Sequence, residues 1–186
     1  MTNRTTLLGL STLLVMGTIG TASAASSGAA SGPRWREPVI TYTAEPNPQA
    51  AETVDWAIDQ YRQAGLQLPD LTISFKSFCS GKGALYHVGK RSIDFCRINK
   101  RRVLHELAHA WDDTSGSVDR DAFLKLRGLT VWWGGTGMPS DEQGAEHLAE
   151  IMAWGLMGAD PSNVPDLPHN SLTELTEAFD FLNGTV

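Results

Sequence analysis

Residues 103–113, VLHELAHAWDD, constrain this chain more than any other stretch. On a helical wheel of about 100° per residue, His105 and His109 lie one turn apart and roughly opposite an apolar stripe. That stripe consists of Leu104, Leu107, Ala108 and Trp111. A fold that contains this segment must therefore bury one side of a helix in its core and use the other side for a polar site.

The two histidines have the spacing of the HExxH pattern. Imidazoles four residues apart on a helix can bind one metal ion together. Glu106 lies on the flank of the same face, where its carboxylate can reach a metal-bound water without being a ligand itself. We therefore predict one zinc ion held by His105 and His109, with Glu106 as the general base of a hydrolytic reaction.

A catalytic zinc ion usually takes three protein ligands, so a third must come from elsewhere in the chain. One class of peptidases supplies a histidine six residues after the second, but that position is Ser115 here. Without that histidine, Met138 in GTGMPS is interpreted as a core or loop residue rather than as part of a Met-turn. The stretch GAEHLAE offers Glu146 and Glu150 instead, four residues apart on one helix face.

Over roughly residues 93–156, these motifs resemble the gluzincins, the thermolysin-like zinc peptidases. A later helix in that family carries Glu-x-x-x-Asp, in which the Glu binds zinc and the second acid orients the first histidine. The resemblance implies that Glu146 is the ligand and that Glu150 accepts the N–H of His105, and an exchange of these roles stays open. HAWDD is also similar to the neprilysin-like branch, and the wider run is similar to small exported bacterial proteins of zincin type.

The resemblance leaves two functions of the family's site without an assigned residue. Thermolysin has an Asn before its ligand Glu, which orients the second histidine, whereas this chain has Ala145. Asp112, one turn after His109, is a candidate for that role, and a solvated helix-end acid is the alternative. His147 and Tyr86 are candidates for stabilising the transition state, with a surface histidine and a core tyrosine as the alternatives.

The N-terminal residues predict export. An uncharged, mainly apolar run follows Arg4 and is shorter than the about 20 residues that span a bilayer. Ala22-Ser23-Ala24 then has the small-x-small pattern that signal peptidase cleaves. We expect secretion after cleavage near Ala24, with a signal peptide over residues 1–24, a flexible lead-in over 25–37 and a single catalytic domain over 38–186.

The chain's two cysteines, Cys79 and Cys96, both lie in the part expected to be exported. An even number in an oxidising compartment predicts one disulfide. Closing a loop of this size stabilises a fold by about 3 kcal/mol in the chain-entropy model. Two thiolate metal ligands are the alternative, but the sequence shows no close cysteine pair.

The net charge of −6 argues against nucleic acid or an anionic membrane as the main partner. The run of cations at residues 100–102 is interpreted as a solvated first helical turn. We expect a monomer with a peptide or protein substrate and no stable membrane association. The alternative is a secreted, metal-stabilised binding or structural protein without hydrolytic activity.

The patterning predicts an α+β, zincin-like fold: a small mostly antiparallel or mixed sheet, then an active-site helix and a glutamate helix. Strands are expected at 38–43, 71–75, 84–88 and 92–95, the last two forming a hairpin that an extended peptide would join. Helices are expected at 48–63, after the Asn99 cap and at 119–126. Two more are expected to begin with capping boxes: one runs from Ser140/Gln143 to 157, and the other from Ser171/Glu174 to Gly184. Trp132-Trp133 is either a wall of the cleft or core under a loop.

Overall fold

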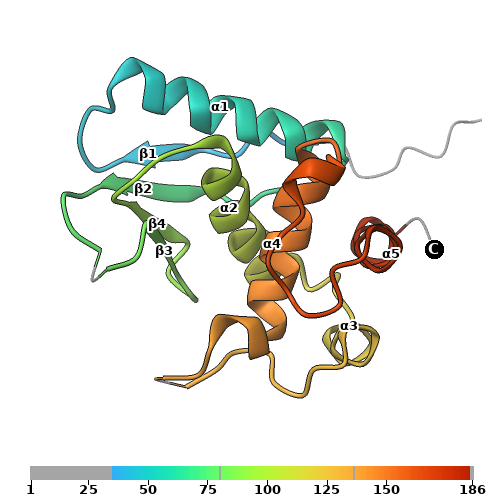
Figure 1. Ribbon diagram of the computed structural model, residues 1–186. Helices are drawn as coiled ribbons and strands as arrows, with labels where there is room; N and C mark the ends of the chain where they lie inside the picture. The colour runs from blue at the N-terminus through green and yellow to red at the C-terminus, as the bar shows by residue number, and fades with distance from the viewer. Residues whose placement is uncertain (1–34, 80, 136, 185–186) are drawn as a thin grey trace, which may run out of the picture. The chain divides into compact units, whose positions relative to one another are not determined.

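The computed structural model describes residues 35–79, 81–135 and 137–184. The expected signal peptide, residues 1–24, and the lead-in up to residue 34 lie outside the described residues. Within the described part, five α-helices and a four-stranded mixed sheet form an α+β fold (Figure 1). The predicted α+β class and the mixed sheet are therefore confirmed.

The strand order of the sheet is β1-β2-β4-β3. The strands β1 (Ile40–Tyr42), β2 (Leu71–Phe75) and β4 (Ser92–Phe95) run parallel, and β3 (Ala84–His87) pairs antiparallel with β4. The hairpin expected between the last two strands is thus present, with Tyr86 opposite Ile93. Because β3 is last in the order, its outer edge has no strand partner in the described part of the chain.

Local signals define the first two long helices. Helix α1 (Pro48–Gln63) begins with a proline, and the Asn47 side chain accepts a hydrogen bond from the Ala50 backbone N–H. Asn99 caps α2 (Lys100–Ser115) in the same way, and Gly116 ends it in the left-handed conformation that glycine adopts readily. The apolar stripe of α2 is buried, as its spacing predicts, in one core with the inner face of the sheet and the other helices.

Among the later helices, one begins at a different residue from the one expected. Helix α3 (Arg120–Arg127) is capped by Asp119, and α5 (Leu172–Asn183) has the predicted Ser171/Glu174 capping box. The Ser140/Gln143 capping box is wrong: Ser140–Glu142 is a short 3-10 helix, and α4 (Gly144–Leu156) begins after it. The reason is that the Gln143 side chain accepts from the Gly134 N–H and donates to the Met138 carbonyl, so it closes the preceding loop.

The start of the fold also lies earlier than expected. Residues 35–37 were expected in the flexible lead-in, but the Arg36 backbone N–H donates to Gln67 Oε1 at 2.8 Å. The Arg36 guanidinium pairs with Asp70 at 2.9 Å. The strand expected from residue 38 begins only at Ile40, because the Val39 N–H donates to the Asp70 carboxylate rather than to a strand.

Cys79 and Cys96 form the predicted disulfide, with their Cα atoms 5.9 Å apart. The bond ties the loop before β3 to the residue that follows β4, so it fixes the hairpin at its base. Among the described helices, none is both long and apolar enough to cross a membrane.

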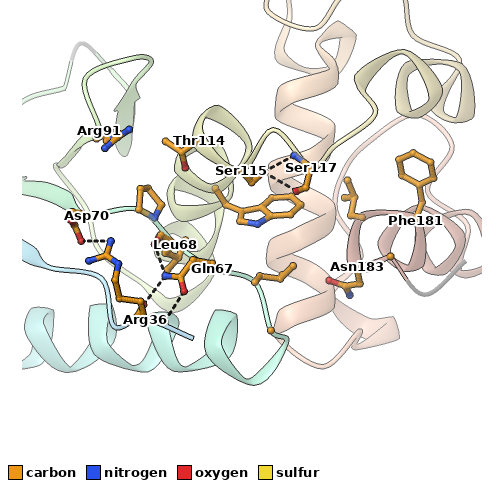
Figure 2. A pocket seen from close by; sticks show the side chains of 16 residues that line it. Arg36, Gln67, Leu68, Asp70, Arg91, Thr114, Ser115, Ser117, Phe181 and Asn183 are labelled. Carbon is orange, nitrogen blue, oxygen red and sulfur yellow. Dashed lines mark hydrogen bonds and ion pairs between the residues drawn. The ribbon is translucent and has the colours of Figure 1, made fainter. Parts of the chain in front are cut away.

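A cavity of about 660 Å³ lies between the α1–β2 connection, the C-terminal end of α2 and α5 (Figure 2). Several of its polar groups bind one another: Arg36 contacts Asp70 and Gln67, and the Ser117 hydroxyl donates to Ser115 Oγ. The buried Oδ1 of Asn183 has no hydrogen-bond partner among the described residues. No histidine lines the cavity. The residues predicted to form the functional site lie elsewhere, where α2 meets α4.

Candidate metal centre

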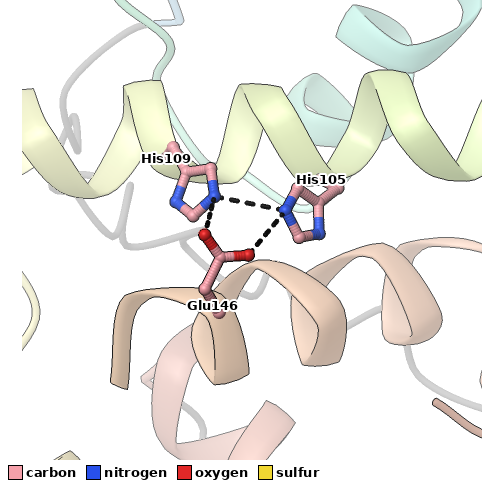
Figure 3. Close-up of side chains that lie close together, drawn as sticks. All are labelled: His105, His109 and Glu146. Atoms are coloured by element: carbon pink, nitrogen blue, oxygen red, sulfur yellow. Dashed lines mark hydrogen bonds and ion pairs between the residues drawn. The ribbon is translucent and has the colours of Figure 1, made fainter. Parts of the chain in front are cut away.

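Helices α2 and α4 pack together and bring three side chains to one point (Figure 3). The Nε2 atoms of His105 and His109 are 3.2 Å apart. One carboxylate oxygen of Glu146 lies 3.3 Å from Nε2 of His105, and the other lies 3.7 Å from Nε2 of His109. Residues far apart in the sequence thus meet as a group that could hold a metal ion.

The geometry of this group fits a small divalent cation. Tetrahedral ligands bonded to zinc at about 2.0–2.2 Å lie about 3.4 Å from one another. The two imidazole nitrogens, 3.2 Å apart, and the 3.3 Å from His105 Nε2 to one oxygen of Glu146 are close to that value. The 3.7 Å contact to His109 is made by the other oxygen of Glu146, and with one ligand atom taken from each residue the three atoms lie within 4.8 Å of one another. Two imidazole nitrogens and a carboxylate oxygen are also a donor set that suits zinc and other divalent transition metals.

Glu150 lies one turn further along α4 and faces the other nitrogen of His105. Its Oε1 is 3.2 Å from His105 Nδ1, which is within ion-pair distance although the N–H direction does not meet the angle of a hydrogen bond. Its Oε2 accepts from Nη2 of Arg101 at 2.5 Å. Of the two acids, Glu146 therefore faces the convergent nitrogens and Glu150 backs His105, which is the arrangement that the family resemblance implies.

Without a metal, the two histidines carry unequal charge. Burial alone would lower the pKa of His105, but the carboxylates of Glu146 and Glu150 outweigh it and raise that pKa to about 10. Burial, followed by the charge on His105, lowers the pKa of His109 to about 3. One imidazole proton thus occupies the centre of the group at neutral pH, and a metal ion must displace it to bind.

Glu106 lines the same cleft as the three clustered side chains and is 6% exposed. Burial, helped by the negative charge of Glu146, raises the pKa of its carboxyl group, although the positive charge of His105 opposes this. A carboxylate with a raised pKa is a stronger base than a solvated one. The position and the basicity of Glu106 both suit proton transfer in the cleft.

The ring of His109 is held by aromatic neighbours. The Tyr86 ring lies 6.3 Å away at 24°, and the Trp133 ring lies 5.2 Å away at 42°. Asp112, the sequence-based candidate for orienting His109, instead accepts hydrogen bonds from Arg120 and from the Trp132 indole N–H. His109 Nδ1 is buried and has no hydrogen-bond partner among the described residues. That candidate role for Asp112 is not met, because Arg120 and Trp132 take up its carboxylate.

The two candidates for transition-state stabilisation are engaged in other contacts. His147 is fully buried; its Nε2 lies 2.9 Å from the Asp141 carbonyl oxygen and its Nδ1 lies 3.4 Å from the Arg127 guanidinium. Burial, together with Arg127, lowers the pKa of His147 although the Asp141 carbonyl opposes this, so the ring is neutral. Tyr86 lines the cleft, but its hydroxyl donates to Asp113 at 2.7 Å. Neither polar group points at the clustered side chains.

A cleft of about 850 Å³ opens over the three clustered side chains, a volume typical of ligand sites. One wall is the Lys82–Val88 side of the hairpin, and the other is formed by described residues of the glycine-rich segment, at 133–135 and between 137 and 143. The two tryptophans have different roles, since Trp132 packs against the core and Trp133 lines the cleft beside His109. The sequence reasoning gave Trp133 no specific contact; the glycines that follow it were the available signal that its ring lies at an open surface.

No family model, no curated protein and no solved structure matches this chain. The functional interpretation therefore rests on the geometry of this chain's own residues.

Proposed function

We propose that this chain is a secreted, zinc-dependent metallopeptidase that hydrolyses internal peptide bonds. The observation that carries the proposal is the convergence of His105, His109 and Glu146 in a cleft that Glu106 also lines. The three ligand atoms, one from each residue, lie within 4.8 Å of one another, which supports a shared metal ion, and a buried base lies beside them.

Each residue has a defined task in this proposal. His105, His109 and Glu146 would hold the ion, and Glu150 would orient His105 through Nδ1. A bound zinc ion would supply a Lewis acid that polarises a substrate carbonyl and lowers the pKa of water. Glu106 accepts the proton of the attacking water and passes it to the leaving amine.

The outer edge of β3 gives the substrate a place to lie. Its backbone borders the cleft from Ala84 to Tyr86 and has no strand partner in the described part of the chain. An extended peptide can add to such an edge through main-chain hydrogen bonds. A peptide bound there would cross the face of α2 beside Glu106, so the substrate class that fits is an extended peptide or an unfolded protein segment.

The decisive experiment combines metal analysis with a peptide-library digest. The mature protein should hold one zinc ion and cleave peptides, with cleavage lost on chelation and restored by zinc. Glu106→Gln should keep the zinc but lose turnover, because the amide cannot accept the proton. Glu142→Gln, at an exposed position in the 3-10 helix, is the matched control and should cleave normally. Undiminished cleavage by Glu106→Gln would rule out Glu106 as the base.

One observation favours a second candidate, a metal-stabilised binding protein without hydrolysis. Peptide hydrolysis needs a group that stabilises the developing oxyanion, and the polar atoms of Tyr86 and His147 are both bonded elsewhere. A chain of this kind would bind zinc and gain thermal stability from it, yet cleave no peptide in the library. Chelator-sensitive cleavage by the wild-type protein would exclude this candidate.

A further inference from the structure

We infer that the cleft continues past Glu106 into a cationic subsite that binds an acidic side chain of the substrate. The inference rests on the proposed function and names the substrate class: extended peptides with an Asp or Glu close to the cleaved bond. It follows from a side pocket, an arginine without a carboxylate partner and a lysine at the rim of the cleft.

The side pocket has a volume of about 200 Å³ and shares Gly83, Ala84, His105 and Glu106 with the main cleft. The residues that it adds are Asn99, Arg101, Arg102 and Glu150. This volume is below the about 300 Å³ at which whole-ligand sites begin. The pocket is therefore of a size to receive one side chain of a molecule that is held in the main cleft.

Arg102 supplies the positive charge of this pocket that is not paired with a carboxylate in the described part of the chain. Arg101 is paired with Glu150, but the one hydrogen bond of the Arg102 guanidinium within the described residues is a long one, 3.5 Å to the Arg97 carbonyl. A guanidinium has five N–H donors, so most of those on Arg102 remain available to a ligand. Their fork geometry matches both oxygens of a carboxylate.

Gly83 allows the Arg102 side chain to take this position. A Cβ atom at residue 83 would lie 2.5 Å from Arg102 Cζ, so the guanidinium packs directly over the glycine backbone. The sequence-based interpretation of residues 100–102 as a solvated helical turn does not describe Arg102, which is only partly exposed. A guanidinium restricted in this way loses less conformational freedom when it binds a carboxylate.

Lys82 adds a second cation where the two pockets meet. It is exposed, lines the main cleft beside Gly83, and pairs with no acid in the described part of the chain. The chain as a whole is acidic, at −6, so two unpaired cations at one end of the cleft provide a local attraction for an anionic group.

The test uses peptides in which a single Glu or Gln scans each position on both sides of one cleaved bond. Wild-type protein cleaves them, and zinc-loaded Glu106→Gln reports binding by calorimetry without turnover. At one position the Glu peptide should be favoured over the Gln peptide about tenfold, with the ratio falling as salt rises. The ratio should fall most of the way to one in Arg102→Gln, where Lys82 remains, and be restored only in part in Arg102→Lys, because lysine lacks the fork geometry. Lys125→Gln on α3 is the charge-matched control.

The outcomes separate the two proposals. Cleavage or binding with no preference for Glu at any position overturns the subsite alone, as does a preference that Arg102→Gln leaves unchanged. The absence of both cleavage and peptide binding in the zinc-loaded wild-type protein overturns the proposed function, and the subsite with it. A thermal melt of each variant checks that Arg102→Gln acts on binding and not on folding.

Discussion

His105 and Glu150 face each other across the α2–α4 contact, with Nδ1 and Oε1 3.2 Å apart. Arg101 holds the other oxygen of Glu150. A row of alternating charge therefore runs from Arg101 through Glu150 to a histidine whose second nitrogen faces Glu146. Because each member fixes the next, the row sets the position of one proposed metal donor.

The two acids of α4 should differ in their effect on metal binding. Glu146→Gln removes a donor and should leave little zinc on the purified protein. Glu150→Gln removes only the group behind His105 and should weaken zinc affinity about 10- to 100-fold. Competition with a chromophoric chelator measures both affinities, and Glu142→Gln serves as the control. A larger loss in Glu150→Gln than in Glu146→Gln would reverse the assigned roles.

Asp113 should stabilise the hairpin by anchoring it to α2. Its Oδ2 accepts from both the Tyr86 hydroxyl and the Gly89 backbone N–H, each at 2.7 Å. Asp113→Ala removes two charge-assisted hydrogen bonds and should lower the free energy of unfolding by about 2–3 kcal/mol. Tyr86→Phe keeps the bond to Gly89 and should cost about half as much. Denaturant unfolding measures both, and equal losses would show that the Gly89 bond adds nothing.

The neighbouring tryptophans should respond differently to mutation. Trp132 donates to the buried Asp112 carboxylate and packs edge-on against Phe123, so Trp132→Ala should destabilise the fold by about 3 kcal/mol. Trp133 lines the cleft beside His109. Compared with Trp132→Ala, Trp133→Ala should therefore destabilise the fold less and weaken zinc binding more. Thermal melts and zinc competition on the same two variants test this contrast. Equal melting temperatures in the two variants would contradict it.

Asp94 should make stability depend on pH at the acidic end. Burial would raise its pKa, but Lys76 Nζ at 2.5 Å and His87 Nε2 at 2.9 Å outweigh it and lower the pKa below the ordinary 3.8. A lowered carboxyl pKa contributes stability above pH 3.8 that is lost as pH falls through the folded-state value. Asp94→Asn should therefore cost about 1 kcal/mol at pH 7. The gap between the unfolding curves of variant and wild type should close below pH 3.8, and a gap that stays constant would exclude this ion-pair cluster as its source.

Gly155 should not tolerate even a methyl group. A Cβ atom at this position would lie 2.2 Å from the Phe179 ring, where α4 meets α5. Alanine normally favours a helix over glycine by about 1 kcal/mol, but the clash should reverse the sign and destabilise Gly155→Ala by about 1–3 kcal/mol. Combining it with Phe179→Leu should recover part of the loss. Additive effects in that double-mutant cycle would mean that the ring does not oppose the methyl group.

The parts of the fold that follow local rules could be predicted from the sequence. The Asn99 cap, the Ser171/Glu174 capping box and the hairpin depend on residues within a few positions of one another. The Ser140/Gln143 capping box failed because a tertiary contact competed for the same side chain: Gln143 binds Gly134 and Met138 across a loop. Local spacing does not reveal such a competition.

The same distinction holds for the candidate site. The pairing of His105 with His109 follows from helical spacing, and the two acids of GAEHLAE supplied the third residue of the cluster. Asp112 was a reasonable partner for His109 by spacing, yet Arg120 and Trp132 take its carboxylate. Trp133 reaches His109 only through the folded loop. A helical wheel shows which residues share a helix face, but it does not show which loop residues will contact that face in the folded chain.

Arg127 is buried, and its Nη2 donates to the carbonyls of Pro168 and His169 while its Nε lies against His147. His147 is the residue next to Glu146. The buried Arg127 thus ties the connection between α4 and α5 (residues 157–171) to His147, the neighbour of Glu146 in the sequence. Proteolytic cleavage of this connection would release the two carbonyls and leave the Arg127 guanidinium without these acceptors. We therefore expect cleavage there to disturb His147 and Glu146, at the N-terminal end of α4.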